Sequence, residues 1–209
     1  MRIGHKDPPR VFWQSAEPWG KEPWGFAGPT VGAWGCPGAS LACLLGASGD
    51  VAATPLTVVQ AARKHRPAVW APGSSLAVLP ELARSAGFTC PDRSWVTAEG
   101  RALQVACGAI TEAQASKIYA MSAAELSTEI CAIIATGGFA WCCVDKNADG
   151  RGDHWIGAIA YDDEWIYCAD TATARIERLS RKDLTGKALW AKVEKSYRCV
   201  RAYPLTLKR

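Results

Sequence analysis

The length and composition of the chain are those of one folded domain. It has 209 residues, of which 49% are hydrophobic and 21% are charged, and its formal net charge is +4. This composition excludes a disordered chain, and no apolar run is long enough to predict a transmembrane helix. The N-terminus also lacks the apolar core of a signal peptide. We therefore expect synthesis in the cytoplasm and no membrane partner.

The cysteine content indicates a reducing compartment and no disulfide framework. The chain has nine cysteines, an odd number, and no Cys-x-x-Cys pair that would suggest a zinc site. Cys142 and Cys143 are adjacent in an apolar run, and most of the others also have apolar neighbours. We expect eight of the nine to be buried thiols, with Cys36 as the exception.

The predicted elements place residues 1–209 in a single domain with three parts. Residues 1–35 are rich in Trp, Pro and Gly and are expected to form loops, residues 36–137 are mainly helical, and residues 138–209 form a sheet with a basic tail. Helices are predicted at residues 36–46, 54–66, 74–86 and 122–137, and strands at residues 139–144, 155–161, 165–169 and 198–204. Helices followed by an antiparallel sheet predict an α+β fold.

Basic residues are concentrated near the C-terminus. From Thr173 onward there are eleven Lys and Arg against three Asp and Glu. One interpretation is a face for an anionic partner such as nucleic acid or a cell-wall polymer. The other is the solvated face of a hairpin, because the charges are interspersed among Ile176, Leu179, Leu184 and Val193. No nucleic-acid-binding motif accompanies the charge, which favours the hairpin.

Cys36 lies where a Gly-rich loop gives way to an apolar helix. Pro37 suits the first turn of a helix, where its missing N–H has no intrahelical acceptor to lose. Leu41, Leu44 and Leu45 follow with the spacing of one apolar face. The positive end of the helix dipole favours an anion, and the thiolate is the nucleophilic form of cysteine. Cys36 is therefore the candidate nucleophile.

A base and a carboxylate are available on two predicted strands. Of the three histidines, His154 begins a strand directly after a polar loop, and Asp170 ends the following strand. Hairpin geometry places both at the same region of the sheet. A cysteine, a histidine and an aspartate in this arrangement form a nucleophile, a general base and an orienting group. The alternative is a structural strand histidine and a turn aspartate.

These residues carry a resemblance to a known family. The motifs are Gln14-x-x-x-x-Trp19, Gly35-Cys36-Pro37 with Ser40-Leu41-Ala42, Asp153-His154-Trp155, and Ile166-Tyr167-x-Ala169-Asp170. Their order and spacing resemble papain-like cysteine peptidases of the bacteriocin-leader-processing (double-glycine) type and their free-standing relatives in bacteria and phages. The resemblance covers residues 12–65 and 138–172, and it implies a papain-like fold with N-terminal helices packed on a C-terminal antiparallel sheet.

The resemblance also implies roles for individual residues. Cys36 would be the nucleophile, His154 the general base and later the acid, and Asp170 the group that orients the imidazole. Gln14 would donate to the developing oxyanion together with a backbone N–H at the cysteine. Ala16 departs from the family pattern, which has an acidic residue at this position, and this weakens the assignment of Gln14.

A second motif precedes His154. Residues 145–153 match the first nine positions of a calcium loop, with a glycine at the sixth position for the sharp turn. The predicted ligands are Asp145, Asn147, Asp149, the backbone carbonyl of Arg151, and Asp153. Ile156 stands where an EF-hand has its bidentate glutamate, so we expect weak, structural Ca²⁺ binding. The alternative is an Asx-rich turn without a metal ion.

The sequence thus predicts a cysteine peptidase or amide hydrolase. Its expected substrate is a peptide or a peptidoglycan cross-link, cleaved through a thioester on Cys36. The resemblance to phage proteins suggests a virion-associated lysin, with other virion proteins as partners. One alternative is a non-catalytic structural or binding module stabilised by calcium. Another is an acyltransferase, which uses the same three residues with a different acceptor.

Overall fold

The structure is a computed structural model. It describes residues 1–24, 30–65, 79–106, 110–145, 154–190 and 193–208. The helices are α1 (Val31–Trp34), α2 (Cys36–Ala47), α3 (Pro55–His65), α4 (Leu79–Ser85), α5 (Ala98–Ala106), α6 (Glu112–Ala115) and α7 (Ala123–Ala135). The strands are β1 (Ile3–Gly4), β2 (Phe88–Thr89), β3 (Trp95–Val96), β4 (Phe139–Asp145), β5 (His154–Tyr161), β6 (Trp165–Asp170), β7 (Arg175–Ser180), β8 (Thr185–Trp190) and β9 (Val193–Leu207).

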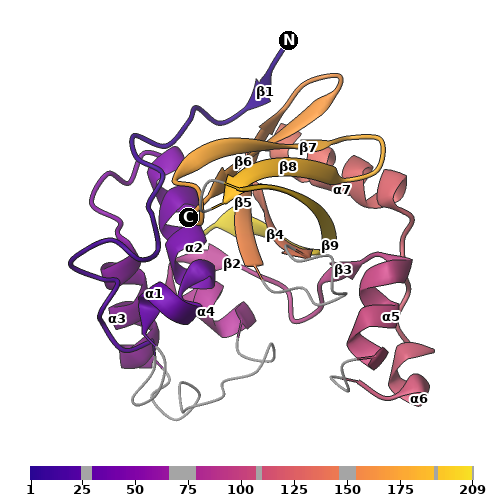
Figure 1. Ribbon diagram of the computed structural model, residues 1–209, viewed down its shortest axis with the longest axis horizontal. Coiled ribbons are helices and arrows are strands. Elements are labelled where there is room, and N and C mark those ends of the chain that lie inside the picture. Colours follow the sequence, from indigo (N-terminus) through magenta and orange to yellow (C-terminus); the bar gives the residue numbers. More distant parts are fainter. Residues whose placement is uncertain (25–29, 66–78, 107–109, 146–153, 191–192, 209) are drawn as a thin grey trace.

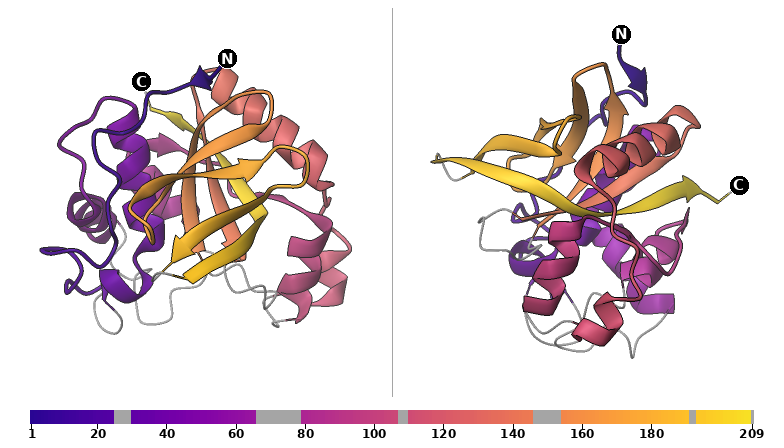
Figure 2. Two further views of the ribbon diagram at one scale, coloured as in Figure 1. Left: turned by 45° about the horizontal axis from the view of Figure 1, so that its top comes forward. Right: turned by 90° about the vertical axis from the view of Figure 1, so that its right-hand side faces the viewer.

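The predicted fold class is wrong. Instead of a papain-like α+β fold with helices packed on a sheet, six antiparallel strands close into a barrel in the order β5-β4-β9-β8-β7-β6, and β6 pairs back onto β5. The short strand β1 pairs with β5, and the short strands β2 and β3 pair with β9. Closure removes the free edges that an open sheet would expose. The helices lie around this barrel, with α2, α3 and α4 on one side and α5 and α6 on another (Figures 1 and 2).

Strand alternation divides the core into two clusters. In β4, Phe139, Trp141 and Cys143 pack with α2, α3 and α4. The intervening Ala140 and Cys142 belong to a second cluster, which includes the apolar face of α7. Because both faces of β4 are buried, its sequence is a continuous apolar run without polar alternation.

Helix α2 is apolar on all sides because it is buried on nearly all sides. Residues 36–44 are all buried, as expected for a helix without a polar face. It packs most closely against β5, where Gly157 lies under Leu44. A Cβ on Gly157 would lie 2.5 Å from a methyl carbon of Leu44. This glycine therefore sets how near the Cys36 helix lies to the strand that begins with His154.

The helix predicted to start at Ser122 begins there with a capping box. The Ser122 hydroxyl accepts from the Glu125 N–H, and the Glu125 carboxylate accepts from the Ser122 N–H. Within residues 88–121, which we expected to be helical, the described part contains the short strands β2 and β3 as well as α5 and α6. No helix in the described part of the chain is long and apolar enough to cross a membrane.

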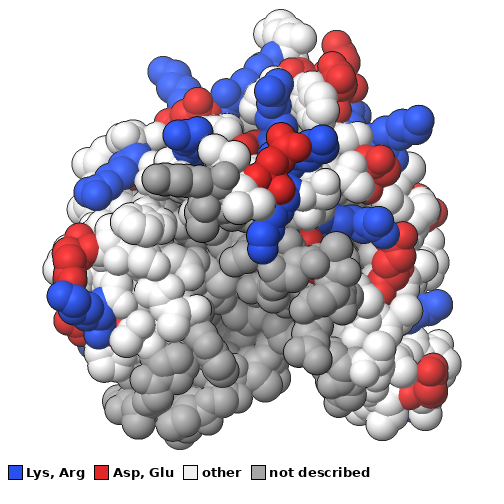
Figure 3. Space-filling view, in the orientation of Figure 1, with Lys and Arg blue, Asp and Glu red and all other residues white. Residues whose placement is uncertain are grey.

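The basic C-terminal part forms strands β7, β8 and β9. Leu179 and Leu184 are fully buried in the barrel, whereas Val193 is exposed. On the face shown in Figure 3, Lys and Arg side chains are interspersed with Asp and Glu. The strands β7 and β8, which we did not predict, contain three basic residues (Arg175, Arg178 and Lys187) among short apolar stretches. That mixture obscures their period-two pattern in the sequence.

Candidate active site

The candidate nucleophile lies at the start of α2. Cys36 is the first residue of the helix, Gly35 is its N-cap, and Pro37 lies in the first turn. The Cys36 side chain is 7% exposed. The Trp24 ring packs against this same turn, since a Cβ on Gly38 would lie 3.0 Å from it. The first turn of α2 is thus held between an aromatic ring and the barrel, and the helix dipole acts on the thiol.

His154 and Asp170 meet at the end of the β5–β6 pair. Asp170 is opposite Ile156 in the register, and His154 lies two residues before Ile156, so both side chains belong to the same face. His154 Nε2 donates to Asp170 Oδ1 over 2.7 Å, and both residues are buried. The same oxygen of Asp170 accepts from the Ala172 N–H over 2.8 Å. Two hydrogen bonds to this one oxygen thereby hold the carboxylate in place.

The structure also brings Cys36 to His154. Burial alone would lower the pKa of His154, but the charge and hydrogen bond of Asp170, together with a hydrogen bond and charge from Cys36, raise that pKa to about 10. Since Nε2 is bonded to Asp170, Nδ1 is the ring nitrogen that remains for Cys36. The three residues therefore form a continuous chain in which the imidazolium of His154 lies between the Cys36 sulfur and the Asp170 carboxylate.

Gln14 lies beside these residues on the N-terminal segment. Its backbone N–H donates to the Thr171 carbonyl over 3.1 Å, and its side-chain Oε1 accepts from the Thr171 hydroxyl over 3.4 Å. Its Nε2 donates to the Gly32 carbonyl over 3.0 Å. An amide nitrogen has two N–H donors, so this bond leaves a second donor for a substrate oxygen. Thr171, which directly follows Asp170, thus holds Gln14 at the site.

A buried hydrogen-bonded pair anchors the first turn of α2 to the barrel. The Ser40 hydroxyl donates to the Pro37 carbonyl over 2.9 Å and accepts from the Trp141 indole N–H over 2.8 Å. Ser40 and Trp141 are both fully buried. Ser40 is one turn after Cys36, so this contact fixes the turn that carries the thiol relative to β4. The sequence motif included Ser40, but this anchoring role was not predicted, although a lone hydroxyl in an apolar helix is a usable signal.

A Ser40→Ala variant tests this anchor. It leaves the Trp141 N–H buried without its acceptor, and we expect the free energy of unfolding to fall by about 1–3 kcal/mol. We also expect slower alkylation of Cys36 in the folded protein. Ser48→Ala is a matched control on the same helix, because the Ser48 hydroxyl also donates to the carbonyl three residues earlier but contacts no tryptophan indole in the described structure. Equal losses in the two variants would contradict the anchor.

The raised pKa of His154 predicts a pH dependence of stability. The folded value of about 10 is above the ordinary value of 6.5, so the contribution of charged His154 is complete below about pH 6.5 and is lost as the pH rises to about 10. The expected slope is at most about 1.4 kcal/mol per pH unit. Urea unfolding of the wild type and His154→Gln across this range measures it. Parallel curves for the two proteins would contradict the prediction.

The predicted calcium ligands stay untested. Asn147, Asp149, Arg151 and Asp153 lie outside the described residues, and Asp145 is described as the last residue of β4. Among the described residues there is no group of three or more His, Cys, Asp or Glu side chains that could hold a metal ion.

Two of the N-terminal tryptophans close the core. Trp19 and Trp24 are buried in the cluster that includes α2. The Trp19 indole N–H donates to the Trp13 carbonyl over 2.9 Å, which holds the segment next to Gln14. Trp13 itself is 54% exposed. The segment therefore packs over the start of α2 and leaves one aromatic ring at the surface.

Comparison with known proteins identifies no relative of this chain. No protein-family model matches it, and neither a curated protein nor a solved structure matches it. The functional argument therefore depends on the geometry of Cys36, His154 and Asp170 and on the motifs that carry them.

Proposed function

We propose that this protein is a cysteine hydrolase that cleaves amide bonds through a thioester on Cys36. The observation that supports this is the buried chain of contacts from Cys36 through His154 to Asp170, with Cys36 at the first position of a helix. A nucleophile, a base and an orienting carboxylate are the parts that acyl transfer requires.

In the first half of the reaction, the Cys36 thiolate attacks the carbonyl carbon of the amide, and the negative charge moves to the carbonyl oxygen. The Cys36 N–H, at the first turn of α2, has no intrahelical acceptor. It and the Gln14 amide are the donors we propose for this oxyanion. The His154 imidazolium then gives its proton to the leaving nitrogen. The C–N bond breaks, the amine departs, and a thioester remains on Cys36.

In the second half, neutral His154 takes a proton from water as the water oxygen attacks the thioester carbon. The C–S bond then breaks, the acid product leaves, and the thiolate forms again beside the imidazolium. Asp170 keeps the ring oriented with Nε2 toward itself throughout, so that Nδ1 serves Cys36 and the substrate. In this scheme His154 carries the proton in each transfer, and the reaction requires no other titratable group.

The substrate we propose is a peptide amide, with peptidoglycan cross-links as the first to examine. The resemblance of the Cys36, His154 and Asp170 motifs to free-standing phage and bacterial peptidases supports this choice, and it is also the basis for proposing a role as a virion-associated lysin.

A cleavage experiment tests the proposal. The full chain is incubated with cross-linked muropeptides and with a peptide library, and new termini are identified by mass spectrometry. We expect products with the wild type and none with Cys36→Ala, together with a mass adduct on Cys36 when the reaction is quenched early. Products that form equally with Cys36→Ala would contradict the assignment of Cys36 as the nucleophile.

A further inference from the structure

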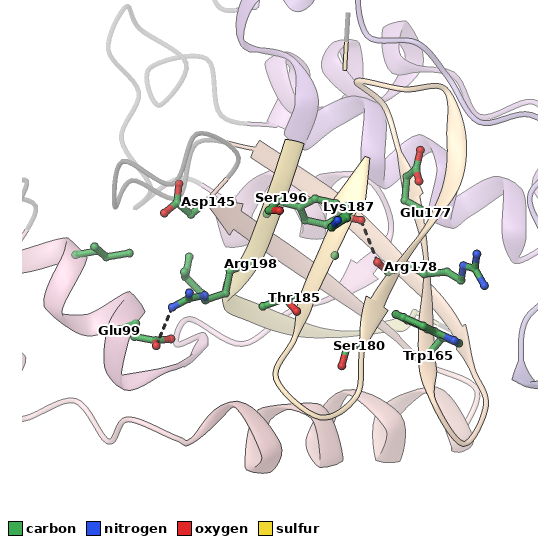
Figure 4. Close-up of a pocket in the computed structure, with 14 residues that line it drawn as sticks. Glu99, Asp145, Trp165, Glu177, Arg178, Ser180, Thr185, Lys187, Ser196 and Arg198 are labelled. Atoms are coloured by element: carbon green, nitrogen blue, oxygen red, sulfur yellow. Dashed lines mark hydrogen bonds and ion pairs between the residues drawn. The ribbon is translucent and has the colours of Figure 1, made fainter. Parts of the chain in front are cut away.

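A hollow lies on the outer surface of the barrel. It has a volume of about 750 Å³, which lies in the range of small-molecule sites. None of Cys36, His154 and Asp170 lines it. Its floor is the outer face of β8 and β9, with Glu99 of α5 on one side and Trp165 of β6 on the other (Figure 4). We call this hollow the outer trough.

The floor of the outer trough is made of small and hydroxylated residues. Thr185 and Ser196 point outward, because they alternate along their strands with the buried Leu184 and Tyr197. Between them lies Gly186, at which a Cβ would lie 2.4 Å from the Arg178 carbonyl. A glycine here is required by the close approach of β7.

The charges of the described residues that line the outer trough cancel. These residues include three cations and three carboxylates: Arg178, Lys187, Arg198, Glu99, Asp145 and Glu177. Arg198 is paired with Glu99 over 2.8 Å, and Lys187 is paired with Glu194 over 3.2 Å. An anionic polymer would meet the three carboxylates, and a cationic ligand would meet the three cations. The lining therefore favours a ligand without net charge.

The polar groups of the outer trough suit a ligand rich in hydroxyl groups. Each serine or threonine hydroxyl has one donor and two acceptor positions, and the paired Arg198 and Glu99 add donors and acceptors side by side. At the far wall the Trp165 ring, half-buried, has the Arg178 guanidinium 5.3 Å from its centroid. An aromatic ring beside hydrogen-bonding groups is complementary to a sugar ring, which has apolar C–H faces and hydroxyl groups around its edge.

An extended peptide fits the outer trough less well. Strands β8 and β9 pair with each other from Thr185–Arg198 to Trp190–Val193, so the backbone groups along the floor are already used. A peptide would have to bind through side chains alone.

We propose that the outer trough is a binding site for a neutral carbohydrate chain. The site does not depend on the hydrolase activity proposed above, and it binds without any reaction at Cys36. If the substrate is peptidoglycan, the glycan strand is the part that this site holds.

Calorimetric titration of the full chain with a soluble chito-oligosaccharide tests the site. We expect saturable binding that is weakened roughly tenfold or more by Trp165→Ala, a loss of the size expected for one aromatic contact. Trp13→Ala is the matched control, because Trp13 is exposed on the N-terminal segment. Thr185→Val and Ser196→Ala, which keep side-chain size nearly constant, are each expected to weaken binding by a smaller factor.

Three outcomes would overturn the proposal. They are an absence of saturable binding, an equal loss in Trp13→Ala and Trp165→Ala, and preference for an oligosaccharide of uronic acids over the neutral one. If Trp165→Ala does not fold, the test is carbohydrate binding by Thr185→Val and Ser196→Ala, and wild-type affinity in both variants would overturn the proposal. Cys36 labelling is measured on the same samples, so a failed carbohydrate site and a failed hydrolase assignment give separate signals.

Discussion

A His154→Gln variant is expected to lose roughly a hundredfold in the alkylation rate of Cys36 near pH 6. In the wild type the His154 imidazolium, whose pKa is raised to about 10, keeps a positive charge beside the Cys36 sulfur. Without it, Cys36 keeps only the helix dipole, and an ordinary thiol is less than about 1% ionised at this pH. Iodoacetamide labelling followed by mass spectrometry measures the rate.

The control for this variant is His5→Gln. His5 Nε2 donates to the Gly138 carbonyl, and the ring stacks on Phe139, so its replacement changes a part-buried contact without touching Cys36. Circular dichroism in the aromatic region verifies that both variants are folded. Equal Cys36 labelling in the wild type and His154→Gln would show that the histidine does not activate the thiol.

An Asp170→Asn variant is expected to reduce amide hydrolysis by about three to four orders of magnitude. The asparagine keeps the shape of the side chain but removes the negative charge that opposes the burial of His154. The pKa of His154 then falls, because burial favours the neutral imidazole. Alkylation of Cys36 at neutral pH should slow, because a neutral imidazole places no positive charge beside the sulfur.

Asp162→Asn is the matched control for Asp170→Asn. Asp162 lies in the turn between β5 and β6, and hydrogen bonds from Tyr167, Trp165 and Glu164 lower its pKa to about 2. Replacing Asp162 therefore removes a hydrogen-bonded carboxylate from the same hairpin. This carboxylate lies at the opposite end of β5 from His154. If Asp170→Asn keeps wild-type turnover, or if both variants lose it equally, Asp170 does not orient the catalytic imidazole.

Local patterns in the sequence predicted the elements that carry the candidate site. The Pro37 signal and the apolar face after it mark the start of α2, and Ser122 and Glu125 mark the start of α7. The β5–β6 hairpin placed His154 and Asp170 at one end of two paired strands. These predictions depend on residues close together in the chain, where spacing alone carries the information.

The closed barrel could not be predicted in this way, because it depends on pairings between distant segments. Strand β4 pairs with β9, and β7 meets β8 at Leu179 and Gly186. The same limit applies to the site. Ser40 and Trp141 are 101 residues apart, and Thr171 contacts Gln14 across 157 residues. No local pattern links such pairs, so the residues that position Cys36 and Gln14 emerge only from the folded chain.

The most direct test of the central claim is the ratio of iodoacetamide labelling rates at Cys36 and Cys131 in the wild type at neutral pH. The two thiols are 7% and 6% exposed, so the ratio reports chemical activation and not access. Burial raises the pKa of Cys131. The account predicts that Cys36 is labelled at least tenfold faster, as expected for a thiolate paired with an imidazolium. Equal rates at the two cysteines would contradict it.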